Sequence, residues 1–193
     1  MERMLVPVIY GSVRHHRVGI RAARYVVSAL EKRGIEAVLI DPMEYQLPLL
    51  DKMYKEFERG TAPESLEKLA KLYKAADGFV IVSGEYNQNI PPALSNILDY
   101  FLEEYFWRPA GIVTYSGGRY AGTRAGYALR TMLGEMGMVT MPSMFQIANV
   151  EHTFDEHGVP SDPKTDEFSS MFFDELLWYM KVLKPARAAG VPY

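Results

Sequence analysis

Residues 79–99 read FVIVSGEYNQNIPPALSNILD, in which an apolar run, a polar loop and an amphipathic helical pattern follow one another directly. The run Phe79 to Val82 has the length and composition of a buried strand. The helical pattern begins at Pro92, and proline suits the first turn of a helix. In an open α/β sheet, ligands bind beyond the carboxyl ends of the strands. The loop of residues 84–89, which carries Tyr86, is therefore predicted to be a binding loop by its position and its composition.

Strand and helix patterns alternate along the whole chain of 193 residues. This alternation predicts one α/β domain over residues 1–193, a three-layer α/β/α sandwich around a five-stranded parallel sheet. Right-handed crossovers favour the strand order 2-1-3-4-5. Strands are expected at about Val6–Tyr10, Ala37–Ile40, Phe79–Val82, Ala110–Tyr115 and within Val139–Ile147, and helices at about Val18–Arg33, Pro63–Ala76, Pro92–Glu103, Arg124–Met136 and Thr165–Lys184.

Several local patterns refine this outline. Pro7 falls in a strand that would be central, so we expect it at the beginning of the strand or at a bulge. Thr61 and Glu64 have the spacing of a capping box for the second helix. The last helix is expected to end before Pro185. Asp41 follows the second strand, but without a Gly-x-Gly-x-x-Gly fingerprint it is predicted to start a loop rather than to bind a ribose.

The composition excludes several classes of protein. The chain has no cysteine, which rules out disulfides, thiolate nucleophiles, iron–sulfur clusters and the low-molecular-weight tyrosine phosphatases. Any redox role must therefore use a bound cofactor. The net charge of −3 argues against nucleic-acid binding. The four histidines lack the spacing of metal ligands, so no metal site is expected. No apolar run approaches a membrane span and no signal-peptide core precedes the first strand, so we expect a cytoplasmic protein.

A second loop, Gly11 to Gly19, joins the first strand to the first helix. It offers the hydroxyl of Ser12, the guanidinium groups of Arg14 and Arg17, and the positive end of a helix dipole. These donors suit a phosphate, although the loop matches neither the P-loop nor the Gly-x-Gly-x-x-Gly pattern. Taken alone, a solvated arginine-rich turn explains the loop equally well.

A third loop, Tyr115 to Arg124, follows the fourth strand and contains three glycines, at 117, 118 and 122. Glycine lets main-chain N–H groups approach a planar ligand closely, although a flexible turn is the better explanation for this loop alone. The three loops follow strands one, three and four, which are neighbours in the predicted order and flank its switch point. They should therefore meet at one crevice with contacts for a phosphate, a ring face and a pyrimidine edge, the set that flavin mononucleotide (FMN) requires.

These segments resemble those of the NADPH-dependent FMN reductases, which have a flavodoxin-like fold. Residues 84–87 resemble the family's Pro-Glu-Tyr-Asn loop, with Gly84 in place of proline. Residues 11–19 match the Gly-Ser-x-Arg-x-x-Arg-Val-Gly loop of one branch of the family. Residues 115–124 resemble its Ser-Tyr-Gly…Gly-Gly-x-Arg-Ala segment more loosely. The resemblance covers roughly residues 5–150.

The resemblance implies an FMN-dependent oxidoreductase with a two-step cycle. NADPH or NADH donates a hydride to the flavin N5, and an acceptor such as a quinone, free flavin, an azo compound or a metal oxyanion then takes the electrons. The flavin carries the chemistry, so no catalytic side chain is expected. The implied contacts are Ser12, Arg14, Arg17, Val18 and Gly19 at the phosphate, Glu85, Tyr86 and Asn87 along the ring, and Ser116, Gly117 and Gly118 with N–H groups near N1 and O2.

Two alternatives remain open at this point. A flavodoxin-like electron-transfer protein would share the fold, but such carriers usually have a phosphate loop without arginines and a strongly acidic surface. A flavin-binding regulatory protein without turnover is the other alternative. The basic loop and the mild net charge favour the enzyme.

The aromatic run between Leu98 and Trp107 bears on assembly. Core packing is its default explanation, but the run is apolar on more than one face, which is typical of a subunit interface. Together with the family resemblance, this pattern predicts a homodimer or a dimer of dimers. An aspartate at Tyr105 or Phe106 is then expected to weaken assembly while leaving the fold intact.

Overall fold

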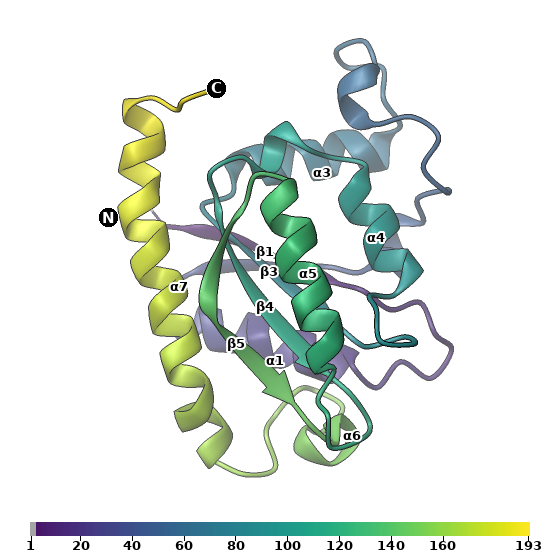
Figure 1. Cartoon of the computed structure of the whole chain (residues 1–193), viewed down its shortest axis with the longest axis vertical. Helices are drawn as coiled ribbons and strands as arrows, with labels where there is room; N and C mark the ends of the chain where they lie inside the picture. The colour runs from purple at the N-terminus through teal and green to yellow at the C-terminus, as the bar shows by residue number, and fades with distance from the viewer. Residues whose placement is uncertain (1–2) are drawn as a thin grey trace.

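The computed structural model describes residues 3–193, and its centre is a five-stranded sheet (Figure 1). The strands pair in parallel in the order β2-β1-β3-β4-β5. The flavodoxin-like order expected from the sequence is thereby confirmed. The strands are β1 (Leu5–Tyr10), β2 (Glu36–Ile40), β3 (Phe79–Ser83), β4 (Pro109–Tyr115) and β5 (Val139–Ile147).

Helices cover both faces of the sheet. The main helices are α1 (Ile20–Glu31), α3 (Glu64–Ala75), α4 (Pro92–Asp99), α5 (Thr123–Glu135) and α7 (Lys164–Ala189), and the short ones are α2 (Pro42–Tyr45), α6 (Val150–Thr153), η1 (Tyr54–Glu56) and η2 (Glu103–Tyr105). One core packs α1 and α7 against the sheet, and the other packs α3, α4 and α5 against the opposite face. In Figure 1, α7 runs along the whole left side of the sheet. The three-layer α/β/α sandwich is therefore confirmed.

Pro7 lies inside β1, neither at its beginning nor at a bulge as expected. It is in register with Val38 of β2, while pairing with β3 begins one residue later, at Val8. The missing N–H of the proline therefore falls before the third strand joins the ladder, and this placement makes proline tolerable in a central strand.

The aromatic run is mainly core. Helix α4 ends at Asp99, short of the expected Glu103. Tyr105 is fully buried, and its ring packs 5.7 Å from that of Tyr73 and 5.3 Å from that of Phe79. Burial of these rings against the sheet draws the chain inward after α4 and overrides the helical pattern. The expectation that Tyr105 lies at a subunit interface is therefore wrong.

Helix α7 continues through Pro185 to Ala189, beyond its expected end. Its last turns are tied to the sheet by the buried carboxylate of Asp77, which lies 3.1 Å from the Lys184 ammonium and 3.8 Å from the Arg187 guanidinium. Proline removes only one hydrogen bond of the helix, and the ion pairs of Lys184 before it and Arg187 after it hold this part of the helix in place.

The expected capping box at α3 does not form. The N-cap residue is Pro63, and no side chain caps the helix. The Thr61 hydroxyl instead donates to the Glu58 carbonyl at 2.8 Å.

Candidate functional site

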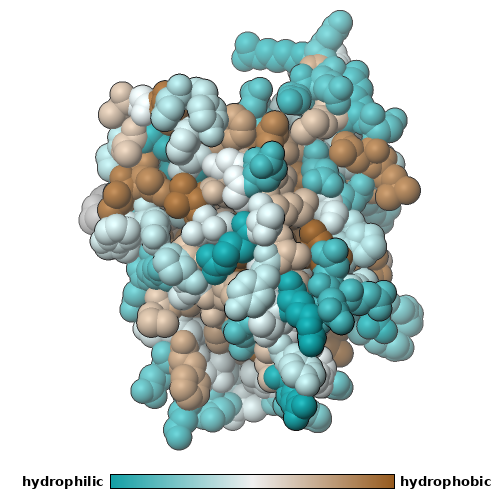
Figure 2. All heavy atoms as spheres, in the orientation of Figure 1, coloured by the Kyte–Doolittle hydropathy of each residue, from teal (hydrophilic) through white to brown (hydrophobic). Residues whose placement is uncertain are grey.

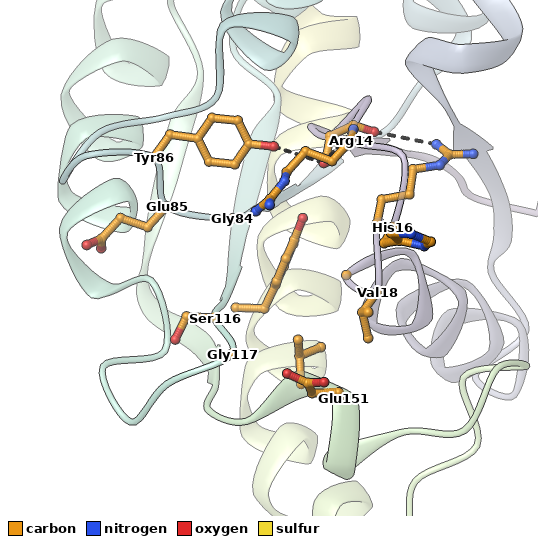
Figure 3. A pocket seen from close by; sticks show the side chains of 14 residues that line it. Arg14, His16, Val18, Gly84, Glu85, Tyr86, Ser116, Gly117 and Glu151 are labelled. Carbon is orange, nitrogen blue, oxygen red and sulfur yellow. Dashed lines mark hydrogen bonds between the residues drawn. The ribbon is translucent and has the colours of Figure 1, made fainter.

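Loops after β1, β3 and β4 line a single cavity of about 230 Å³ at the carboxyl ends of the strands (Figure 3). Every site residue predicted from the sequence lines this cavity except Asn87 and Gly118. The cavity therefore lies at the carboxyl ends of β1, β3 and β4, where the predicted strand order places the crevice. The lining residues are Ser12, Arg14, His16, Arg17, Val18, Gly19, Gly84, Glu85, Tyr86, Tyr115, Ser116, Gly117, Val150 and Glu151.

The loop after β1 presents free backbone donors. Within residues 3–193, several of its amide N–H groups donate no hydrogen bond. Helix α1 starts directly after Gly19, and no side chain caps it there. Free N–H groups at a helix N-terminus form a ready anion site. The free donors are those of Ser12, Val13, His15, His16, Arg17 and Gly19.

The two arginines of this loop are not equivalent. The Arg17 guanidinium forms an ion pair with the buried carboxylate of Asp41, and this contact raises the pKa of Arg17 above its ordinary value. The exposed Arg14 has no carboxylate partner in the described part of the chain. Asp41 also accepts a hydrogen bond from the Met43 N–H at 2.9 Å and so caps α2. Arg14 is therefore the arginine of this loop that is available to an anion.

The loop after β3 closes into a tight hairpin. The N–H of Tyr86 donates to the Asn89 carbonyl at 2.9 Å, and the N–H of Asn89 donates back at 3.0 Å. Asn87 and Gln88 both have left-handed backbone angles, with φ of 51° and 67°, as a type I′ turn requires. The Tyr86 hydroxyl lies 3.2 Å from the Ser12 hydroxyl and links this hairpin to the loop after β1. Gly84 therefore precedes a hydrogen-bonded hairpin.

The Glu85 side chain does not face the cavity, contrary to the sequence-based expectation (Figure 3). Its carboxylate accepts from the N–H groups of Arg124 at 2.9 Å and Ala125 at 3.4 Å, and it pairs with the Arg124 guanidinium. Gly122, the N-cap of α5, has no side chain to play that role. Glu85 caps α5 from another loop, so only its backbone remains for a ligand.

Tyr115 forms part of the cavity wall, although no sequence motif singled out this role. A Cβ atom on Gly19 would lie 2.0 Å from the Tyr115 ring, and one on Gly84 would lie 3.2 Å from it. The Tyr115 ring therefore packs against Gly19 and Gly84 in space that a larger residue at either position would fill. The Tyr115 hydroxyl donates to the Tyr10 hydroxyl at 3.3 Å, and burial raises the pKa of Tyr115 well above its ordinary value. Tyr115 is therefore neutral at physiological pH.

Of the three site residues predicted in the loop after β4, two have a free backbone N–H. The Ser116 N–H is already bound to the Ile147 carbonyl at 3.1 Å, so it cannot serve a ligand as expected. The N–H groups of Gly117 and Gly118 donate no hydrogen bond within residues 3–193. The Glu151 carboxylate lies close by, 3.4 Å from the position of a Cβ on Gly117.

Residues 3–193 contain neither a metal-ligand cluster nor a membrane-spanning helix. No three histidine, aspartate or glutamate side chains gather as metal ligands would. None of the helices in this range combines the length and the apolar character that a membrane crossing needs.

The comparisons with known proteins agree with this geometry. Residues 4–152 match the family model of the NADPH-dependent FMN reductases. A quinone reductase of Pseudomonas putida is 25% identical over 92% of this chain and 95% of its own length. An NADPH azoreductase of Bacillus sp. is 27% identical over 95% of this chain and 97% of its own.

A solved structure supports the fold. The flavoenzyme NAD(P)H:(acceptor) oxidoreductase FerB of Paracoccus denitrificans superposes with a TM-score of 0.74 at 22% identity, over 93% of this chain and 98% of that one. The family match spans the sheet from β1 to β5 and all three loops of the cavity. The chain belongs to the NADPH-dependent FMN reductase family, and it is an oxidoreductase that uses FMN and NAD(P)H.

Proposed function

We propose that the cavity binds one FMN per chain and that the enzyme reduces a small acceptor with NAD(P)H in two steps. The observation that carries the proposal is the meeting of three loops in one cavity, each with a different kind of contact. The loop after β1 offers anion donors, the hairpin after β3 offers an aromatic ring, and the loop after β4 offers bare backbone N–H groups.

The loop after β1 fits a phosphate. Its free N–H groups and the unpaired guanidinium of Arg14 are the donors that a dianion requires. The Ser12 hydroxyl is held near them by Tyr86. Only one such anion loop is present among the cavity residues, which favours FMN over a dinucleotide.

The other side of the cavity fits an isoalloxazine ring. FMN, when bound, supplies the chemistry by taking a hydride from NAD(P)H and passing electrons to the acceptor. The N–H group of Gly117, which lines the cavity, would stabilise negative charge on the pyrimidine edge of the ring. Tyr115 is neutral and buried, so it would shape the site without moving a proton. We therefore propose that no side-chain acid or base is indispensable.

The names of the relatives support two classes of acceptor. One relative is a quinone reductase and another is an NADPH azoreductase. We propose a quinone or an azo compound as the acceptor, with free flavin and metal oxyanions as further candidates.

Three measurements on the purified protein test the proposal. Chromatography of the released cofactor should give FMN, and a predominance of FAD would contradict the single anion loop. Anaerobic addition of NADPH should bleach the flavin spectrum. A quinone should then sustain NADPH oxidation; bleaching without turnover would instead indicate an electron carrier or a regulatory protein.

A further inference from the structure

The segment that follows β5 supplies part of the cavity wall. Helix α6 begins after its N-cap residue Asn149, whose N–H donates to the Gly118 carbonyl at 3.4 Å. The next N–H, that of the buried Val150, donates to the Ser116 carbonyl at 3.1 Å. These two hydrogen bonds join α6 to the loop after β4, and Val150 and Glu151 therefore line the cavity.

Helix α1 holds this segment in place. The Arg21 guanidinium donates to the carbonyl of Glu151 at 3.2 Å and to that of Phe154 at 3.1 Å. The centre of the buried Phe154 ring lies 4.9 Å from that of the Tyr25 ring. Further along the segment, a Cβ atom on Gly158 would lie 2.7 Å from the Tyr25 backbone nitrogen. These contacts give the segment a defined position on α1, so the fold determines which of its side chains reach the cavity.

Glu151 brings an unpaired negative charge to this wall. Two acidic residues line the cavity, Glu85 and Glu151, and the Glu85 carboxylate is turned away to cap α5. Within residues 3–193, the Glu151 carboxylate takes part in no hydrogen bond or ion pair. Its Oε1 lies 3.4 Å from the position of a Cβ atom on Gly117, and Figure 3 shows it at the end of the cavity away from Arg14. The charge therefore lies beside the Gly117 N–H that we assign to the pyrimidine edge of FMN.

We propose that Glu151 lowers the reduction potential of the FMN bound in this cavity, an inference that rests on the proposed function. Hydride transfer brings one proton and two electrons to a neutral ring, so the ring then carries one negative charge. The Gly117 N–H stabilises that charge, whereas the Glu151 carboxylate repels it. The carboxylate therefore weakens the binding of reduced FMN more than that of oxidised FMN, and the potential falls.

The size of the effect is limited by the exposure of Glu151. Its side chain is exposed, and Figure 2 shows mainly hydrophilic atoms at the end of the molecule that carries α6, so water and salt screen the charge. Glu151→Gln should strengthen the binding of reduced FMN about three- to tenfold relative to that of oxidised FMN. For a two-electron couple, this ratio corresponds to a potential that is higher by about 15–30 mV.

A lower potential affects the two steps of the proposed cycle in opposite ways. It makes the reduced flavin a stronger electron donor, so that acceptors that are harder to reduce can still be reduced. It also weakens the driving force for hydride transfer from NAD(P)H. Glu151 therefore favours the second step over the first.

Equilibration of the FMN-loaded protein with a reference dye of known potential, without oxygen, measures the potential of the bound flavin. Glu151→Gln should raise this potential by about 15–30 mV, and by less at high salt. Glu156→Gln is the matched control, because it makes the same charge change in the same segment but Glu156 does not line the cavity. The control should leave the potential unchanged.

Two results would overturn the inference. An unchanged potential in Glu151→Gln would leave Glu151 as an acidic residue that suits the first turn of α6. An equal gain in affinity for oxidised and reduced FMN would show that the charge acts on the phosphate rather than on the ring. Absence of FMN binding by the wild type would refute the proposed function as well, so the two failures are distinguishable.

Arg21 should act as a positioning residue for Glu151. Arg21→Gln removes a positive charge and also the two contacts that hold α6, and the double variant separates these two effects. If Arg21 places Glu151, then Glu151→Gln should raise the potential by less in the Arg21→Gln protein than in the wild type. Equal shifts in the two backgrounds would refute the positioning role of Arg21.

Discussion

The unequal environments of Arg14 and Arg17 lead to a quantitative prediction about FMN affinity. Arg14 is exposed and has no carboxylate partner in the described part of the chain, whereas Arg17 is paired with the buried Asp41. Arg14→Ala removes a charge-assisted donor from the phosphate site. The loss of a hydrogen bond to a charged group at an exposed position corresponds to about a 10- to 30-fold weaker dissociation constant.

The measurement is a fluorescence titration of the flavin-free protein with FMN at two salt concentrations. Because the lost contact is electrostatic, the difference between the wild type and Arg14→Ala should shrink at high salt. Arg119→Ala is the matched control, because Arg119 lies in the loop after β4 but does not line the cavity. It should leave the affinity within about twofold of the wild type, as for a screened charge at a distance.

Asp41→Asn tests whether Asp41 withholds Arg17 from the phosphate. Asparagine can still cap α2, but it no longer holds Arg17 by charge and no longer repels a phosphate. FMN should bind about 3- to 10-fold more tightly, while the flavin-free protein should be less stable by about 1–2 kcal/mol through the loss of the ion pair. An unchanged dissociation constant in Arg14→Ala, or weaker FMN binding by Asp41→Asn, would refute this division of roles.

Three further outcomes are expected. Gln88→Gly should raise the free energy of unfolding in urea by about 0.5–1 kcal/mol, because glycine adopts the left-handed angle of Gln88 without strain; a loss of stability would contradict the type I′ turn. Burial raises the pKa of Tyr25 to about 12, so its contribution to stability is complete below pH 10 and is lost as the pH rises from 10 to 12. Thermal melts of Tyr25→Phe should accordingly show a weaker alkaline loss than those of the wild type. Tyr105→Asp should abolish cooperative unfolding rather than yield a folded monomer, since it places a charge in the core; a folded, soluble variant would show that the core tolerates it.

The fold could be predicted from the sequence because its determinants are local and repeated. Each buried strand is a short apolar run, and each main helix has an amphipathic pattern, so the alternation and the handedness rule leave few arrangements. The position of the cavity followed from the same topology, since the loops after β1, β3 and β4 must meet. Element boundaries were less accurate where tertiary contacts decide them, as at Tyr105 after α4 and at Asp77 beside the end of α7.

The side-chain roles were harder to predict because they depend on partners far away in the sequence. Arg17 and Glu85 were both expected to contact the ligand from their residue type and loop. In the structure, Arg17 is held by Asp41, and Glu85 caps α5 through Arg124 and Ala125. Neither pairing is encoded in a local pattern, since the partner lies in another loop.

These pairings change which parts of the site are expected to recognise the cofactor. Charged side chains at the ends of the strands are partly engaged in holding the loops against one another, and the free donors that remain are mostly backbone N–H groups. Backbone donors depend on loop conformation and tolerate many side chains. Substitutions that alter loop geometry, at Gly19 beside the Tyr115 ring for example, should therefore impair FMN binding more than the loss of a single lining side chain.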